Sequence, residues 1–252
     1  MSTIEISRSR FYQITYDVTK ESHERFNIGT YKEKKLHLVL KRYFEQNMDY
    51  HEVPCNGFIA DILRENTITE IETSGFTGLN PKLDAYLPEY QVTLVLPLAS
   101  QKYVSWIDLE TGEISPKRRS PKKQTVYNAL CECIRIKKHI GAKNLRILAV
   151  MLEMQEYRVL DGWSTDRKKG SHRYERIPTD LLEIYELTDK SSYAEWIPDV
   201  CQKEFTVETF AKHAKIPAET ARTVIKLMEH MGILAFAGKS GRKYLYSRTD
   251  DL

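Results

Sequence analysis

Four carboxylates in the first third of the sequence have the spacing expected of a divalent-cation site. They are Glu33, Asp61, Glu70 and Glu72. Because side chains alternate along a strand, Glu70 and Glu72 are expected on one face and Ile71 on the other. A tight turn would place Asp61 on the neighbouring strand, opposite or diagonal to them. Three carboxylates in one patch repel each other, and a divalent cation is a usual physical reason to tolerate that arrangement.

The cation expected at such a patch is Mg²⁺ or Mn²⁺. Mg²⁺ binds one or two carboxylates together with water and phosphate oxygens. It would orient a water molecule, assist its deprotonation and stabilise the charge that builds on a scissile phosphate. The alternative is that Glu70 and Glu72 form the solvent side of an amphipathic strand with Asp61 beside them. Spacing alone leaves both interpretations open.

The elements that would position these carboxylates form an α-β-β-β-α-β series. Apolar residues between positions 32 and 46 recur every three or four residues, which predicts an amphipathic helix. Three strands follow, YHEVPC, FIADILR and TITEIETS, joined by turns at Asn56-Gly57 and Glu65-Asn66. Asn-Gly is a strong hairpin signal, because both central residues of a type I′ turn need positive φ. Residues 80–90 predict a second helix, and QVTLVLPL after it predicts a buried strand.

Further elements extend this sheet. KYVSWIDLETG predicts another strand, TVYNALCECIRIKKHI a helix, and LRILAVMLEMQEYRVL a long strand or a pair of strands. Residues 1–28 show no sustained period, so we assign them to an N-terminal arm. The sequence therefore predicts a mixed α/β protein with flanking helices.

This order, with Asp61 on the second strand and Glu70-x-Glu72 on the third, resembles the PD-(D/E)XK nuclease core. The resemblance implies a restriction-endonuclease-like domain over residues 29–178. It implies Asp61 and Glu70 as metal ligands, Glu72 as a ligand or water-orienting base, and Glu33 as an auxiliary carboxylate. The family usually has Lys at position 72, although some restriction enzymes carry Glu there. Lys82 or Lys35 could supply the missing positive charge.

The last part of the chain, residues 179–252, resembles a winged helix. FTVETFAKHAKI and AETARTVIKLMEHMG predict two helices, and the second ends at Gly232. Two β-type runs follow around a Gly-Lys-Ser-Gly-Arg loop. EIETSGF and LDGWSTDRKKGSHRYERIP also resemble an uncharacterised family of bacterial proteins that share this two-part layout.

The winged-helix resemblance implies that the second helix enters the DNA major groove. Its contacts with bases or phosphates would come from Glu219, Thr220, Arg222, Thr223 and Lys226, and the contacts of the wing from Lys239, Arg242 and Lys243. The inward face would carry Ala221, Val224, Ile225, Leu227 and Met228. Winged helices also mediate protein contacts, which remains the alternative.

Basic residues cluster in three runs, although the formal net charge is only +3. Besides the wing, the candidate DNA contacts in these runs are Arg118, Arg119, Arg167, Lys168, Lys169 and Arg173. Each run is expected in a loop, where it would neutralise phosphates or simply be solvated. The run after Asp161 also holds Trp163, which would stack on an unpaired base or anchor a surface loop.

Other functional classes lack their signatures. No apolar run is long enough to span a membrane and the N-terminus lacks a signal-peptide core, so we expect a cytoplasmic protein. The four cysteines lack zinc-site spacing and are expected to be reduced. His37, His51 and His139 are expected to be structural. The chain has no P-loop or dinucleotide fingerprint, so no nucleotide cofactor is expected.

These patterns together predict a Mg²⁺- or Mn²⁺-dependent DNA endonuclease with a DNA-binding winged helix. One alternative is a catalytically inactive nuclease-fold protein that acts as a DNA-binding regulator or recombination accessory. Another is an enzyme that acts on RNA. A homodimer is an expected partner besides DNA, because cutting both strands needs two sites.

Overall fold

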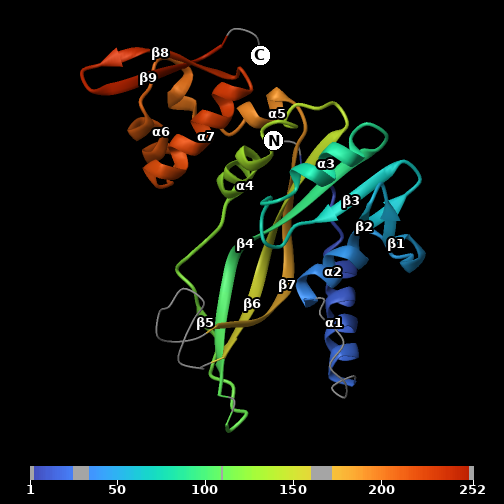
Figure 1. Cartoon of the computed structure of the whole chain (residues 1–252). Helices are drawn as coiled ribbons and strands as arrows, with labels where there is room; N and C mark the ends of the chain where they lie inside the picture. Colours follow the sequence, from blue (N-terminus) through green and yellow to red (C-terminus); the bar gives the residue numbers. More distant parts are fainter. Residues whose placement is uncertain (1–2, 25–33, 109, 160–171, 250–252) are drawn as a thin grey trace.

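The computed structural model describes residues 3–24, 34–108, 110–159 and 172–249. These residues form a large mixed β-sheet with helices on both faces and a smaller group of elements at one end (Figure 1). The helices are α1 (Arg8–Glu24), α2 (Lys35–Phe44), α3 (Asn80–Tyr86), α4 (Val126–Cys133), α5 (Lys190–Ala194), α6 (Val207–Ala214) and α7 (Ala218–His230). Short 3-10 helices are η1 (Met48–Tyr50), η2 (Ile134–Ile136) and η3 (Asp199–Gln202). The predicted mixed α/β class with flanking helices is confirmed.

The sheet strands are β1 (His51–Cys55), β2 (Phe58–Arg64), β3 (Thr67–Ile71), β4 (Gln91–Ile107), β5 (Arg118–Arg119), β6 (Leu145–Val159) and β7 (His172–Leu187). Their spatial order is β1-β2-β3-β4-β6-β7, and β5 pairs with the far part of β4. β1, β2 and β3 form an antiparallel meander, whereas β3, β4 and β6 run parallel. β7 is antiparallel to β6. The predicted α-β-β-β-α-β series is confirmed as α2-β1-β2-β3-α3-β4.

Two hydrophobic clusters hold the layers together. On one face, apolar side chains of α1 and α2, such as Phe11, Val39 and Leu40, pack against β6 and β7. On the other face, Leu83 and Tyr86 of α3 pack with α4 against β4 and β6. Burial of these side chains contributes roughly 25 cal/mol per Å² of apolar surface, which is the main stabilisation of the sandwich.

The tight turn between β1 and β2 has the predicted geometry. Asn56 has φ 45° and Gly57 has φ 82°, and the flanking residues Cys55 and Phe58 are paired across the hairpin. Positive φ at both central positions is the requirement of a type I′ turn. The turn fixes the register of β2, the strand that carries Asp61.

Several predicted bounds differ from the elements of the structure. Residues 8–24 of the expected arm form helix α1, whose core-facing residues Phe11, Ile14 and Val18 follow helical spacing but are few in a mostly polar segment. The two strands predicted across residues 91–107 are one strand, β4, with an irregularity between Ala99 and Gln101. The expected domain boundary at residues 178/179 falls inside β7, a continuous strand whose Leu181 and Ile184 belong to the sheet core.

The C-terminal elements form two helices followed by a hairpin of β8 (Leu234–Ser240) and β9 (Lys243–Arg248). Thr206 caps α6 by accepting a hydrogen bond from Thr209 N, and the left-handed residue Lys215 ends that helix. The five residues predicted to face inward from α7 are buried, as expected. They join the same core as α4, and the hydroxyl of Tyr127 on α4 donates to the carbonyl of Trp196.

Where the structure describes them, the basic runs lie in strands more often than in loops. Arg118 and Arg119 form β5, Arg173 lies in β7, and Lys239 and Lys243 lie in the hairpin strands. Arg242 lies in the turn of the hairpin, as expected, whereas the expectation of loops is wrong for these strand residues because long cationic side chains are well tolerated on exposed edge strands. In the part of the chain that is described, no helix is both long and apolar enough to cross a membrane.

Candidate functional site

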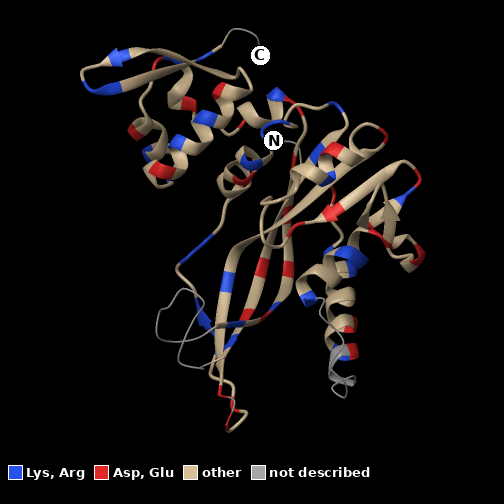
Figure 2. Cartoon of the chain, viewed as in Figure 1, with Lys and Arg blue, Asp and Glu red and all other residues tan. Residues whose placement is uncertain are grey.

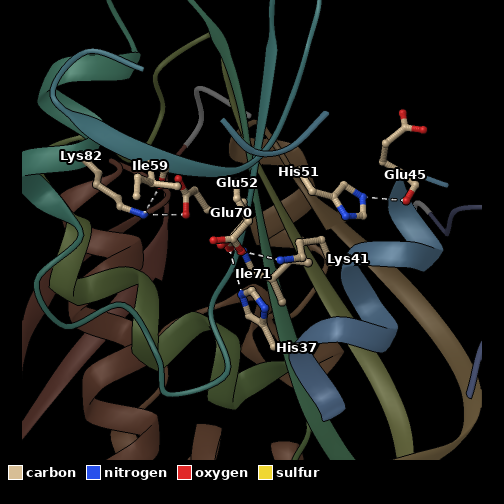
Figure 3. Close-up of polar contacts among 10 residues, drawn as sticks. His37, Lys41, Glu45, His51, Glu52, Ile59, Glu70, Ile71 and Lys82 are labelled. Atoms are coloured by element: carbon tan, nitrogen blue, oxygen red, sulfur yellow. Dashed lines mark hydrogen bonds and ion pairs between the residues drawn. The ribbon is translucent and has the colours of Figure 1, made fainter. Parts of the chain in front are cut away.

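Asp61 lies where β2 and β3 separate. The pairing of these strands includes Ile62 with Thr69 and then stops, and the Asp61 carboxylate fills the gap. Its Oδ2 accepts a hydrogen bond from the backbone N of Ile71 at 2.7 Å and lies 3.1 Å from Nε2 of His37 on α2. Figure 3 shows His37 and Ile71 converging on this point. Asp61 therefore links β3 to α2, and its carboxylate lies where β2 and β3 separate.

Glu70 lies on β3 and is almost completely buried, with 1% of its surface exposed. Its Oε2 is 2.8 Å from Nζ of Lys82 on α3, and the same ammonium donates to the carbonyl of Ile59 at 3.1 Å (Figure 3). The second oxygen, Oε1, is buried and makes no well-formed hydrogen bond among the described residues, and neither does the buried hydroxyl of Tyr86. The two side chains are close enough for Glu70 to raise the pKa of Tyr86, so a ligand at Oε1 would compete with this hydroxyl.

The three carboxylates influence one another electrostatically. Burial and then the charge of Asp61 raise the pKa of Glu70 to about 7, even though Lys82 lowers it. The pKa of Glu72 is also raised, by burial and by Asp61. Burial raises the pKa of Asp61 as well, but the contacts with His37 outweigh it and the net shift is downward. Asp61 therefore holds its charge more readily than the two glutamates do.

The chemistry of these donors fits a hard cation, but the side chains do not form a ready metal centre. Carboxylate oxygens are the ligands that Mg²⁺ prefers, and Oε1 of Glu70 is available. Among the described residues, however, no three His, Cys, Asp or Glu side chains lie together as a metal-binding group. The expected close convergence of Asp61, Glu70 and Glu72 is therefore not present in this arrangement. A shared cation would require these side chains to move closer together.

Two side chains of α2 that pair with carboxylates were not predicted. His37 was expected to be structural, yet it contacts Asp61 directly. Lys41, one helical turn further along α2, is buried and pairs with Glu52, whose φ of 56° is unusual for a residue in a strand. The sequence feature that could have identified them is the four-residue spacing of His37 and Lys41, which puts both polar side chains on the same face of the helix. His51 and His139 contact the backbone of Glu45 and the carboxylate of Asp84, as structural histidines would.

The loop that follows β3 is fixed to helix α4. The carboxylate of Glu132 accepts a hydrogen bond from Phe76 N at 3.0 Å and pairs with Arg135. Gly75 has φ +93°, and a Cβ there would lie 2.5 Å from the Glu132 carboxylate. The positive φ favours glycine, and any larger residue would also displace the Glu132 carboxylate. Glu132 thus determines how the chain leaves β3 directly after Glu72.

An open groove reaches the site from outside. Its volume is about 770 Å³, and it is lined by Lys82 and the β1–β2 hairpin residues Pro54, Cys55, Asn56, Gly57, Phe58 and Ile59. Lys82 lies both in this groove and against Glu70, so a ligand in the groove would meet the ammonium group first. Of the two lysines proposed from the sequence, Lys82 contacts Glu70; Lys35 makes no ion pair with these carboxylates among the described contacts.

The remaining predicted site residues are spread over the molecule. Glu33, Arg167, Lys168, Lys169 and Trp163 lie outside the described residues. On α7, Arg222 and Lys226 are exposed, whereas Thr220 and Thr223 are half-buried. The Thr220 carbonyl faces the Cys131 thiol of α4 at 3.9 Å. Lys239, Arg242 and Lys243 are exposed on the hairpin, where Figure 2 shows Lys and Arg at its free end.

Comparisons with known proteins give a family without an assigned activity. The family described as "Domain of unknown function (DUF8091)" matches residues 34–188, which span α2 to the end of β7. An uncharacterized protein of Treponema pallidum (strain Nichols) is 27% identical over 228 residues, covering 88% of this chain and 87% of that protein. No solved structure matches the chain.

Proposed function

The chain belongs to the DUF8091 family, and we propose that it is a divalent-metal-dependent DNA endonuclease with its site at Asp61, Glu70, Glu72 and Lys82. The observation that carries the proposal is the environment of Glu70. This glutamate is buried beside a second carboxylate, its pKa is raised to about 7, and its ion-pair partner Lys82 lines an open groove. Perturbed carboxylates in such a position mark functional sites more often than surface ion pairs do.

Each residue would have a distinct role. Asp61 and Glu70 would be ligands of the cation, which when bound supplies an acidified water and neutralises phosphate charge. Glu72 is half-buried with a raised pKa, which suits a group that accepts a proton from water. Lys82 would bind a phosphate oxygen through its ammonium group. PD-(D/E)XK nucleases usually have a lysine for this role at the place that Glu72 occupies here. Glu33 would assist as a further carboxylate.

The chain path supports the nuclease resemblance. The spatial order β1-β2-β3-β4-β6, with β2 reversed, puts Asp61 and Glu70 on adjacent strands that separate at the site. The restriction-endonuclease-like assignment of this domain remains part of the proposal. So does the winged helix, which α6, α7 and the β8–β9 hairpin support by their order and by the exposure of Arg222 and Lys226.

A second candidate is a nuclease-fold protein that binds DNA without cutting it. It is favoured by the lack of a metal-binding group among the described residues and by Glu72 in the position where lysine is usual. In that case the Lys82–Glu70 and His37–Asp61 pairs would be permanent structural contacts rather than pairs that open for a ligand.

Incubation of supercoiled plasmid with the full chain distinguishes these candidates. We expect nicking with Mg²⁺ or Mn²⁺, none with chelator, and none from Asp61→Ala, while the control Glu89→Gln, at an exposed carboxylate, cuts normally. Cleavage that persists in Asp61→Ala would refute the assigned site. A wild-type protein that binds the plasmid without cutting it would support the second candidate, and selective cutting of a labelled RNA would redirect the proposal to RNA.

A further inference from the structure

One face of the long sheet carries five cations around a buried carboxylate. The carboxylate is Glu156 on β6, which is 1% exposed. The cations come from four strands and are Arg118 of β5, Lys102 of β4, Arg158 of β6, and Arg173 and Arg176 of β7. Figure 2 shows further Lys and Arg on β5 and on the chain that leads from it to α4.

Strand register puts these residues on the same face. Val104 pairs with both Arg118 and Glu156, and registered residues of neighbouring strands point to the same side. Glu156 pairs in turn with Arg176, and Arg158 pairs with Arg173. Lys102 is two residues from Val104, so it also points to that side. The cations therefore form one row across four strands.

The carboxylate holds part of this row in place. Its Oε2 lies 3.1 Å from Nζ of Lys102 and 3.4 Å from Nε of Arg173, and its Oε1 lies 3.0 Å from Nη1 of Arg158. Burial raises the pKa of Glu156, but Lys102, Arg173 and Arg158 outweigh it, so the group stays ionised. One negative charge fixes the geometry of these cations without neutralising them.

The row retains accessible positive charge. The Arg173 side chain is 49% exposed although it contacts Glu156, and Arg118 is exposed. Arg176 has a buried Nε without a hydrogen-bond partner among the described residues. An excess of cations at fixed spacing is the surface that a polyanion backbone fits best, because each phosphate that binds releases condensed counterions.

The row also adjoins the candidate site. Nη2 of Arg176 donates to the backbone carbonyl of Thr73 at 3.1 Å, and Thr73 directly follows Glu72. A strand of nucleic acid with one phosphate near Glu72 could continue over Arg176 toward Arg173 and Lys102. Glu70 points to the other face of the sheet, because it is in register with Leu94 and Ile147 of the other core cluster.

We propose that Lys102, Arg118, Arg158, Arg173 and Arg176 form a binding surface for the backbone phosphates of duplex DNA, organised by Glu156. The inference rests on the proposed function, since it places the DNA that flanks the cutting site. These contacts would give affinity and orientation rather than base specificity, because phosphates are the same along any sequence.

Fluorescence anisotropy with a labelled DNA duplex at several salt concentrations tests the surface. In Lys102→Gln/Arg173→Gln we expect affinity to fall about tenfold and the salt slope to fall by about two, because each phosphate contact contributes close to one. The matched control is Lys138→Gln, whose exposed lysine pairs with Asp84 outside this row. If the double variant misfolds, Arg118→Gln on the exposed edge strand should lower the slope by about one.

The outcomes separate this inference from the proposed function. Binding that weakens in the cation variants, from a wild-type protein that does not cut, would support the surface and refute the nuclease. Normal cleavage with unchanged affinity and salt slope in both folded variants would refute the surface and leave the nuclease standing. Tighter binding of a matched RNA duplex that depends on the same residues would overturn the assignment to DNA.

Discussion

Replacing Glu70 with glutamine should change how stability depends on pH. In the wild-type protein the pKa of Glu70 is raised from 4.5 to about 7 by burial and by Asp61, with the opposing effect of Lys82 already included. At about 1.4 kcal/mol per pKa unit, this shift corresponds to about 3 kcal/mol. Because Glu70 is almost fully buried, solvent screening does not reduce this figure much.

The sign follows from where the proton is held. Between pH 4.5 and about 7 the folded protein keeps the Glu70 proton, while the unfolded chain has already released it. Unfolding therefore releases a proton, and stability falls as the pH rises through this window. Below pH 4.5, Glu70 does not lower the free energy of unfolding. Above about pH 7, it lowers the free energy of unfolding by about 3 kcal/mol. The glutamine side chain introduced by Glu70→Gln does not ionise, so the variant should lack this loss.

Urea denaturation across this pH range, with chelator present, measures the effect. We expect the free energy of unfolding of Glu70→Gln, relative to wild type, to rise by about 3 kcal/mol from the acid to the alkaline end. Glu89→Gln, at an exposed position, should show no such trend. A difference between Glu70→Gln and wild type that is constant over the whole range would refute the assigned pKa and the reasoning about burial.

Three further changes test other parts of the structure. Lys82→Met should cost about 3 kcal/mol at alkaline pH and less at acid pH, because it leaves Glu70 buried without its cation; an equal loss at both ends of a urea series would contradict this. Glu132→Gln should cost about 1 kcal/mol and slow plasmid cleavage, since a neutral acceptor holds Phe76 N less firmly; cleavage at the wild-type rate would show that the loop after β3 needs no anchor. Phe210→Ala should cost about 4 kcal/mol by opening a cavity between α6 and Tyr127 of α4, and calorimetry showing an unchanged melting temperature would exclude that packing.

The sequence predicted elements whose signals are local. The Asn56-Gly57 turn requires positive φ at both positions, so it located the β1–β2 hairpin and placed Asp61 on β2. The apolar spacing along α7 identified its buried side. Patterns of this kind depend on neighbouring residues alone, which is why they can be read without the fold.

The remaining features depend on contacts between distant segments. Lys82 and Lys35 were equivalent in the sequence, and the packing of α3 against β3 brings Lys82 to Glu70. His37 looked structural because its partner, Asp61, is 24 positions away. The continuity of β7 past residue 178 was hidden because polar residues alternate irregularly along a strand with several shifts in register.

Titration of Mn²⁺ into the metal-free protein, followed by electron paramagnetic resonance, tests most directly whether these carboxylates share a cation. We expect the wild-type chain and Glu89→Gln to bind Mn²⁺ alike, whereas Asp61→Asn and Glu70→Gln should lose that binding while remaining folded. Equal Mn²⁺ binding by all four proteins, or none by the wild type, would contradict a cation site at these carboxylates.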